Sequence, residues 1–301
     1  MNTCVEIAGV KFKNPVITAS GTFGFGKEYN ELYPIGMLGG ICTKGLTIKE
    51  REGNLSPRIA ETPSGILNSV GLQNPGIDYY LEHYDEWLST MGTAVIANIA
   101  GSKLEDYVAI ATKINESKAD MVELNISCPN VRSGGIAFGV QPDSVRRVTE
   151  AVKKVCNKPV ITKLTPNVSC IADNAKAAED GGADAISLIN TITGMAVNYK
   201  TRRPILANNT GGMSGPCVKP VALRMVWECY NAVSIPIIGM GGITSYTDVL
   251  EFMICGARAV QVGTANIANP FAAKEIVEDL QEYVKRENID INSLVGTLQI
   301  N

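Results

Sequence analysis

Short apolar runs recur along the whole chain and alternate with segments of helical periodicity. The runs are rich in Val and Ile and mostly lack apolar/polar alternation, which is typical of strands covered on both faces. We predict eight strands, at Pro15–Ser20, Gly40–Lys44, Ala94–Ala100, Met121–Ser127, Pro159–Leu164, Ala185–Asn190, Pro236–Met240 and Ala259–Val262. Helical spacing predicts helices at Gly76–Thr90, Leu104–Ser117, Asp143–Val155, Ile171–Asp180, Pro220–Ala232 and Tyr246–Cys255.

The remaining segments are weaker in pattern. The first interval between strands holds only a short turn around Glu28–Leu32, and a charged helix at Pro270–Glu287 closes the chain. Cys4–Phe12 alternates weakly, so we expect a hairpin at the bottom of the fold. The long polar segment Gly194–Val218 is interpreted as an extended loop after the sixth strand.

Eight strand–helix units in 301 residues predict an α/β fold, the (β/α)8 TIM barrel, with inserted loops at its C-terminal mouth. No linker composition divides the chain, so we expect one domain over residues 1–301. A doubly wound sheet is the alternative, but it normally carries a glycine fingerprint after the first strand. The segment Ser20–Gly26 is glycine-rich with the wrong spacing for that fingerprint.

Composition excludes several classes of function. The net charge is −3 without a basic block, which disfavours nucleic acid as a partner. No apolar run approaches the ~20 residues that span a bilayer, and charged residues interrupt the N-terminal segment before a signal peptide could form. The eight cysteines form no C-x-x-C pair, which argues against zinc or iron–sulfur ligation by this chain and indicates a reduced, cytoplasmic protein.

The predicted strands end in polar or small residues, and in a barrel these ends converge on one mouth. The set contains lysines and asparagines, but neither a carboxylate pair nor a group of metal ligands. The only histidine, His83, lies in a helical pattern, which argues against Ser-His-Asp, Cys-His and zinc-hydrolase sites. The strand-end residues are Ser20, Lys44, Asn98, Asn125, Lys163, Asn190, Gly241, Gly242, Gly263 and Thr264.

The fourth predicted strand ends abruptly in amide, hydroxyl and thiol side chains, Asn125, Ser127, Cys128 and Asn130. Pro129 ends the strand ladder, and the later Gly134-Gly135 pair lets the following loop move. A thiol flanked by amides at a strand end is typical of a catalytic loop, here roughly Ser127–Gly139. The alternative is a buried, inert cysteine beside a turn.

The segments Ile238–Thr244 and Val262–Ala265 put small residues after the seventh and eighth strands. Backbone N–H groups at these positions commonly form a phosphate site in barrels. The alternative is that these glycines form tight turns only. Phosphate, amides and a lysine without metal ligands favour a phosphorylated organic cofactor such as FMN. Lys163 would then supply a cation beside the flavin N1/O2 edge. The alternative for Lys163 is a solvated lysine at a strand end.

Several motifs together resemble one family, the catalytic subunits of class 1B dihydroorotate dehydrogenases. The resemblance covers essentially the whole chain. The Cys128 loop with its Val131-Arg-Ser-Gly-Gly135 continuation is closer to class 1B than to class 1A, and class 2 enzymes have Ser in place of the cysteine. The motifs are Ala19–Gly24, Thr43–Gly45, Asn68–Gly76, Asn125–Asn130, Gly134-Gly135, Thr162–Leu164, Ile189–Thr191, Gly211–Pro216 and Gly239–Gly242.

The resemblance implies oxidation of dihydroorotate to orotate in de novo pyrimidine (UMP) biosynthesis, with Cys128 as the base that takes the C5 proton while flavin N5 receives the hydride from C6. The residues it implies for FMN are Ser20, Lys44, Gly45, Asn98, Asn125, Lys163, Ile189, Gly215, Gly241, Gly242, Gly263 and Thr264. Those it implies for dihydroorotate are Lys44, Asn68, Ser69, Val70, Gly71, Leu72, Asn125, Asn190 and Thr191.

The resemblance also implies a partner subunit that carries FAD and a 2Fe-2S cluster and passes electrons to NAD, in a heterotetramer built on a dimer of this chain. Three alternatives stay open from the sequence. One is a class 1A homodimer that reduces fumarate, and another is a related flavin enzyme acting on uracil or thymine, of the dihydropyrimidine dehydrogenase type. The third is a flavin-free barrel isomerase or phosphate-binding module.

Overall fold

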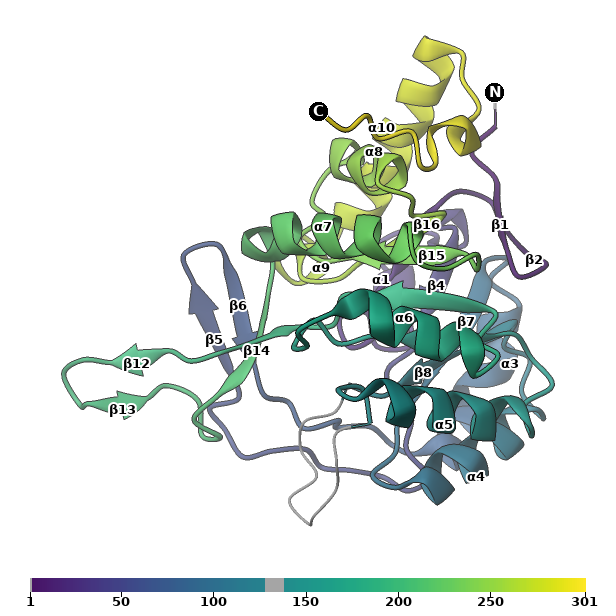
Figure 1. The fold of residues 1–301 in the computed structure, drawn as a ribbon. Coiled ribbons are helices and arrows are strands. Elements are labelled where there is room, and N and C mark those ends of the chain that lie inside the picture. The colour runs from purple at the N-terminus through teal and green to yellow at the C-terminus, as the bar shows by residue number, and fades with distance from the viewer. Residues whose placement is uncertain (1, 128–137) are drawn as a thin grey trace.

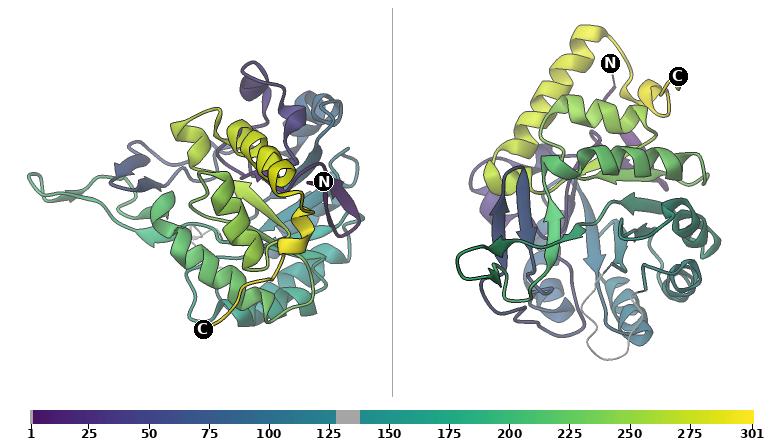
Figure 2. Two further views of the ribbon diagram at one scale, coloured as in Figure 1. Left: turned by 90° about the horizontal axis from the view of Figure 1, so that it is seen from above. Right: turned by 60° about the vertical axis from the view of Figure 1, so that its left-hand side comes forward.

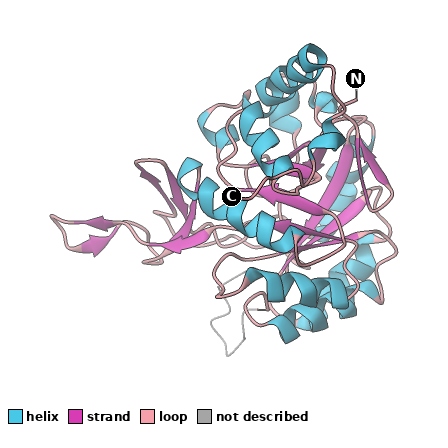
Figure 3. Ribbon diagram, turned by 45° about the horizontal axis from the view of Figure 1, so that its top comes forward, coloured by secondary structure: helices cyan, strands magenta, loops and turns pink. Residues whose placement is uncertain are grey.

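Eight parallel strands form a closed barrel in the computed structural model, which describes residues 2–127 and 138–301 (Figures 1 and 3). The prediction of a (β/α)8 barrel is confirmed. Neighbours around the barrel follow the order β10-β15-β16-β3-β4-β7-β8-β9. Their bounds are β3 Val16–Thr18, β4 Gly40–Cys42, β7 Ala94–Ile99, β8 Met121–Asn125, β9 Val160–Lys163, β10 Ala185–Leu188, β15 Ile237–Met240 and β16 Ala259–Val262.

The strands are buried on both faces, which explains their continuous apolar runs. All six residues of β7 are buried, for example. Alternate residues point outward to the helices and inward to the barrel axis. In β9, Thr162 Oγ1 lies 3.1 Å from Thr149 Oγ1 of helix α5, whereas the next residue, Lys163, contacts Glu123 of β8. The period-2 alternation therefore separates packing residues from residues that face the interior.

Helices surround the barrel at nearly all the predicted positions. The predicted helix Gly76–Thr90 consists of α2, a π-helical turn and α3, and His83 lies in that turn. No helix of the described residues is long and apolar enough to cross a membrane. The bounds are α1 Lys27–Asn30, η1 Ile35–Met37, α2 Ile77–Tyr80, η2 Leu81–Asp85, α3 Glu86–Ser89, α4 Leu104–Ile114, α5 Pro142–Lys153, α6 Ile171–Asp180, η3 Pro216–Val218, α7 Lys219–Tyr230, α8 Tyr246–Ile254, α9 Ala265–Ala268, α10 Ala272–Glu287 and η4 Ile291–Leu294.

The predicted N-terminal hairpin is present as β1 (Val5–Ile7) and β2 (Val10–Phe12). Phe12 is 1% exposed and packs against Gly40, the first residue of β4. A Cβ at Gly40 would lie 3.0 Å from the Phe12 ring, so glycine leaves room for this contact. The hairpin therefore lies against the N-terminal end of the barrel, opposite the mouth.

The prediction of an extended loop at Gly194–Val218 is wrong, because much of this segment is strand. β11 (Ile192–Gly194) and β14 (Gly211–Ser214) pair with each other, and β14 also pairs with β6 (Gly65–Asn68), which pairs with β5 (Ile59–Thr62). This four-stranded antiparallel sheet is called the cover sheet below. Between β11 and β14, β12 (Val197–Asn198) and β13 (Arg203–Pro204) form an arm that projects from the barrel (Figures 1 and 2).

Glycines in the cover sheet allow close packing between segments. A Cβ on Gly65 would lie 2.0 Å from the Ser214 carbonyl oxygen, and one on Gly212 would lie 2.0 Å from Thr191 Oγ1. At Gly65 a backbone carbonyl leaves no room for a Cβ, and at Gly212 the Thr191 side chain occupies that space. Asn68, which the resemblance implies for dihydroorotate, is the last residue of β6.

Candidate active site

A cavity of about 910 Å³ opens at the C-terminal ends of the barrel strands, beneath the cover sheet. This volume is in the usual range for a small-molecule or cofactor site. Except for Asn98, every described residue that the sequence predicted for cofactor or substrate lines it. Cys128, the predicted base, lies outside the described residues. The lining includes Ser20, Lys44, Gly45, Asn68, Ser69, Val70, Gly71, Leu72, Asn125, Lys163, Ile189, Asn190, Thr191, Gly215, Gly241, Gly242, Gly263 and Thr264.

Asn98 lies just behind this lining, at 0% exposure. Its Oδ1 would be 2.8 Å from a Cβ built on Gly45, which does line the cavity. The absence of a side chain at position 45 keeps the Asn98 amide next to the cavity. Asn98 is therefore part of the floor, as predicted, although it is not at its surface.

A buried carboxylate, which the sequence analysis missed, lies under this floor. Glu123 of β8 is 0% exposed and accepts side-chain hydrogen bonds from five other barrel strands. Burial alone raises the pKa of Glu123, but the Lys163 ammonium and hydrogen bonds from neighbouring side chains outweigh it and hold this pKa below the usual range. The donors are Cys42 Sγ at 3.3 Å, Asn98 Nδ2 at 2.7 Å, Lys163 Nζ at 3.3 Å, Ser187 Oγ at 2.8 Å and Gln261 Nε2 at 2.7 Å.

Lys163 is not a solvated strand-end lysine. It is 5% exposed, lines the cavity and forms an ion pair with Glu123. A buried ammonium of this kind supplies a fixed positive charge at the cavity floor, beside Asn125 at the end of β8. That arrangement suits a ligand group that is, or becomes, negatively charged.

Two buried amide oxygens at the floor have no hydrogen-bond partner among the described residues, Asn98 Oδ1 and Gln261 Oε1. Orphaned buried acceptors are rare in folded proteins, since each costs free energy until a donor reaches it. A flavin ring carries an imide N–H, which is the type of donor these oxygens lack. The residues present therefore fit a flavin, with acceptors and a cation at one end of the cavity.

Backbone that follows β15 and β16 forms a further stretch of the lining, at the C-terminal ends of these strands. Gly241 and Gly242 both have positive φ, 126° and 76°, and a Cβ on Gly242 would lie 2.9 Å from the Gly215 carbonyl oxygen. Thr264 Oγ1 donates to Ser214 Oγ at 2.8 Å, which joins this stretch to the cover sheet. Small residues and hydroxyls gather here, which is the composition expected of a phosphate site in a barrel.

Asp248 fixes the chain just beyond these glycines. Its Oδ2 accepts from the backbone N–H groups of Thr244 and Ser245, at 2.7 and 2.9 Å. Its Oδ1 accepts from Lys219 at 2.6 Å. The turn between β15 and α8 is thus held from within the chain, and the backbone next to it is shaped before any ligand binds.

Lys44 provides a second cation at the mouth, and no carboxylate of the described residues lies within ion-pair distance of it. Burial, and secondly the positive charge of Arg58, lower the pKa of Lys44. An unpaired ammonium in a half-buried position is an anion-binding group, because an incoming carboxylate would supply its missing partner.

Amide side chains gather where the cover sheet meets the strand ends. Asn190 Nδ2 donates to Asn125 Oδ1 at 3.4 Å, and Asn190 Oδ1 accepts from the Thr191 backbone at 2.8 Å. Asn68 Nδ2 donates to the Gly212 carbonyl at 3.3 Å. These amides come from β6, β8 and the end of β10, so segments far apart in the sequence form one polar wall.

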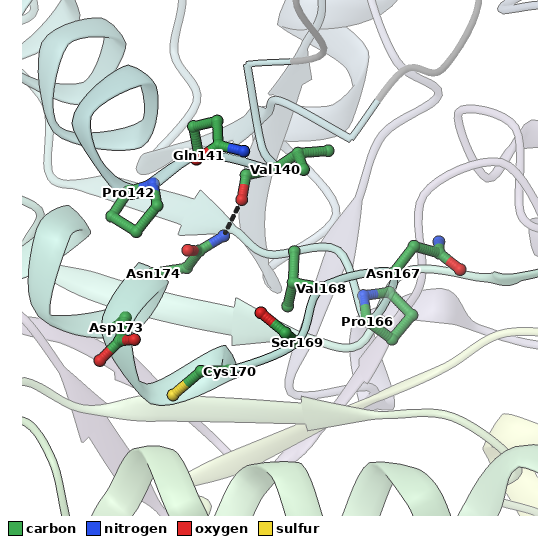
Figure 4. Close-up of a pocket in the computed structure, with 10 residues that line it drawn as sticks. All are labelled: Val140, Gln141, Pro142, Pro166, Asn167, Val168, Ser169, Cys170, Asp173 and Asn174. Carbon is green, nitrogen blue, oxygen red and sulfur yellow. Dashed lines mark hydrogen bonds between the residues drawn. The ribbon is translucent and has the colours of Figure 1, made fainter.

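A second cavity, of about 460 Å³, lies beside the first at the starts of α5 and α6. Figure 4 shows the Asn174 side chain donating to the Val140 carbonyl across it. Its described lining contains no cation, and Asp173 and Cys170 are its only ionisable side chains. It therefore lacks the positive charge for an anionic ligand, and the larger cavity is the candidate active site.

Comparison with known proteins places this site in a family. The family model described as dihydroorotate dehydrogenase matches residues 2–284. The chain belongs to the dihydroorotate dehydrogenase family. The family assignment made from the sequence motifs is confirmed.

Within the described residues, no group of three or more His, Cys, Asp or Glu side chains could hold a metal ion.

Relatives within this family match over essentially their full length. A protein from Thermoanaerobacter sp. (strain X514) is 54% identical, and one from Caldicellulosiruptor saccharolyticus is 52% identical, with 100% of each chain covered in both cases. One from Oceanobacillus iheyensis is 52% identical over 99% of this chain and 98% of its own. All three are named "Dihydroorotate dehydrogenase B (NAD(+)), catalytic subunit".

Proposed function

We propose that this chain is the catalytic subunit of an NAD-linked dihydroorotate dehydrogenase, which oxidises dihydroorotate to orotate in de novo pyrimidine biosynthesis. The observation that carries the proposal is the cavity floor, with Lys163 and the unpartnered oxygens of Asn98 and Gln261, together with the glycine backbone after β15 and β16. The family membership and the names of the relatives support the same reaction.

FMN is the proposed cofactor, one per chain, and residues 1–301 form one FMN-binding domain. When bound, FMN supplies the two-electron acceptor for the substrate. Lys163 holds a positive charge at the floor, and Asn98 offers an acceptor beside it. The glycines and Thr264 receive the phosphate through backbone N–H and hydroxyl groups. The proposed binding residues are Ser20, Lys44, Gly45, Asn98, Asn125, Lys163, Ile189, Gly215, Gly241, Gly242, Gly263 and Thr264.

Dihydroorotate is the proposed substrate, and its carboxylate fits the unpaired Lys44 ammonium. The amide edges of the substrate ring fit the wall of amide and hydroxyl side chains, which can both donate and accept. This wall excludes water from the ring and orients C5 and C6. The proposed substrate-binding residues are Lys44, Asn68, Ser69, Val70, Gly71, Leu72, Asn125, Asn190 and Thr191.

Cys128 is the proposed base that removes the C5 proton. Loss of this proton from C5 and of a hydride from C6 creates the C5–C6 double bond of orotate, and the proton is held at Sγ. The residue follows Ser127, which lines the cavity and whose Oγ donates to the Lys163 carbonyl at 3.4 Å. The support for this role is the sequence context and the family resemblance.

A partner subunit with FAD and a 2Fe-2S cluster is the proposed route for electrons to NAD, in a heterotetramer built on a dimer of this chain. The relatives are named catalytic subunits and their names include NAD(+), which supports a partner and this acceptor. A cytoplasmic location stays a prediction from the cysteine usage. Expression with and without the neighbouring genes tests the partner, since NAD reduction should require it and fumarate should be a poor acceptor in both preparations.

Stopped-flow reduction of bound FMN by dihydroorotate tests the chemistry. We expect Cys128→Ser to slow it by roughly 10²–10⁴-fold, the usual worth of a positioned base, with FMN still bound. The remaining activity should move to higher pH, because a hydroxyl ionises less readily than a thiol. Equal rates and superimposable pH profiles for wild type and variant would contradict the role of Cys128.

A further inference from the structure

Glu123 has no direct role in the proposed chemistry, yet it is the most highly connected polar side chain described under the cavity. It is an ionised carboxylate, so all of its hydrogen-bonding positions are acceptors. Any amide that contacts it must present its NH2 group. The orientation of these amides therefore follows from chemistry and does not depend on how oxygen and nitrogen are assigned.

This constraint determines which atoms of the floor amides remain for a ligand. Asn98 and Gln261 each give their NH2 group to Glu123, at 2.7 Å in both cases. Each amide oxygen is then directed away from Glu123, and both oxygens are buried without a partner among the described residues. If position 123 could donate, one of these amides would turn and present its NH2 group where it now presents an oxygen.

Charge gives Glu123 a second effect on the same floor. Its Oε1 lies 3.3 Å from Lys163 Nζ, and the two side chains are 0% and 6% exposed. With so little solvent to screen them, the negative charge partly offsets the field of the ammonium in the cavity. Removing that charge while keeping the shape would leave the ammonium field uncompensated and would favour a more negative ligand.

We propose that Glu123 is a positioning residue of the flavin site, which orients the Asn98 and Gln261 oxygens toward acceptor roles and moderates the attraction of Lys163 for reduced FMN. This inference rests on the proposed FMN-dependent function. It assigns Glu123 two measurable consequences, on the affinity for oxidised FMN and on the ratio of affinities for reduced and oxidised FMN. The second is a redox property that a purely structural role would not change.

The test uses apo-protein reconstituted with FMN, for wild type, Glu123→Gln and a matched control, Asp85→Asn. Asp85, the last residue of η2, is also a buried carboxylate and is 7% exposed. It accepts a hydrogen bond from the Lys118 backbone N–H at 2.8 Å. Titration gives the Kd for oxidised FMN, and equilibrium reduction against a reference dye gives the reduced-to-oxidised affinity ratio. The proposed function itself is tested on the wild-type protein alone. It would be overturned if this protein bound no FMN, or if dihydroorotate did not reduce the bound FMN.

For Glu123→Gln we expect oxidised FMN to bind at least about tenfold more weakly, since an N–H at position 123 forces one of its five donors to turn or to lose its partner. The reduced-to-oxidised ratio should rise about tenfold or more, and tenfold is about 30 mV for a two-electron couple. Asp85→Asn should lower the Tm and leave both quantities unchanged. A ratio within about twofold of wild type in Glu123→Gln would overturn the inference while leaving the proposed function intact.

Should Glu123→Gln fail to fold, Gln261→Met decides the question. This variant keeps the Glu123–Lys163 pair and removes only one of the oriented amides. Oxidised FMN should again bind about tenfold more weakly, as expected for a lost buried hydrogen bond. The redox ratio should stay near that of wild type, because no charge is removed. Wild-type affinity in Gln261→Met would overturn the proposal.

Discussion

The barrel floor and the cover sheet enclose one cavity but are stabilised in different ways. The floor belongs to the main hydrophobic core, and its polar side chains meet at one buried carboxylate. The cover sheet has a separate small core of Ala60, Leu67 and Leu206. The difference indicates that floor residues determine cofactor binding and stability together, whereas the sheet can be loosened with little effect on the barrel.

Lys163→Ala should have the largest effect, because it removes a buried charged residue from the cavity floor. Removing one member of a buried ion pair costs about 3–5 kcal/mol of stability, and the cation beside FMN is lost as well. We expect a lower Tm and either loss of bound FMN or strongly slowed FMN reduction. Lys153→Ala is a control, since its pair with Asp184 is half-buried on the outside of the barrel. A variant that retains bound FMN and reduces it at the wild-type rate would refute the role of Lys163.

Lys44→Ala should have the next largest effect, confined to the substrate. Loss of a charge-assisted contact to the carboxylate should cost roughly 1.5–3 kcal/mol, or about 10- to 150-fold in kcat/KM for dihydroorotate. The Tm should change little, because the ammonium has no carboxylate partner among the described residues. Wild-type protein that turned over dihydrouracil, which lacks the carboxylate, as well as dihydroorotate would count against this role and would favour a dihydropyrimidine dehydrogenase-like activity.

A leucine-to-alanine substitution in the cover sheet and another in the barrel test whether the two regions differ in their contribution to stability. Leu67 of the cover sheet and Leu124 of β8 are 2% and 0% exposed. Leu124→Ala should lower global stability by about 2–5 kcal/mol. Leu67→Ala should instead loosen the sheet locally and raise the KM for dihydroorotate by about two- to tenfold, with FMN content unchanged. Equal losses of stability, measured by denaturant unfolding, would show that the sheet and the barrel are one cooperative unit.

The smallest expected effect is a pH dependence of substrate binding. Burial first, and Arg58 second, lower the pKa of Lys44, so Lys44 loses its charge at a lower pH than an ordinary lysine. The charged form binds the carboxylate, and the KM for dihydroorotate should therefore rise on the alkaline side earlier than for an unperturbed lysine. Arg58→Gln should move this rise to higher pH. A KM that is flat through the alkaline range would contradict the assignment.

The barrel and the convergence of its strand ends were predictable because their signals are local. Val- and Ile-rich runs and helical spacing identify the elements, and barrel topology then brings Lys163 and Asn125 together. Glu123 was missed because only the residues at the strand ends were considered, and Glu123 lies within β8. Its position two residues before Asn125 places both on the same face of β8, and this spacing was the signal that could have found it.

The cover sheet could not be predicted because its pairing is non-local. Asn68 and Gly212 are partners across 144 residues, and no pattern within either segment specifies the other. The segment Gly194–Val218 is long and polar, and glycine is depleted in most strands, so its strands carry little local signal. At Gly65 and Gly212 the reason for glycine is close approach between segments, which appears only once the chain has folded.

The Glu123 network also has a consequence for the order in which the protein folds. Its donors come from strands as far apart in the chain as Cys42 and Gln261, the latter 138 residues from Glu123. The carboxylate is therefore fully paired only when the barrel has closed, late in folding, since such distant contacts form slowly. A one-residue slip of any of these strands would turn its donor outward and leave the buried charge short of a partner. Glu123 thus penalises misaligned barrels and favours the single strand register that builds the active site.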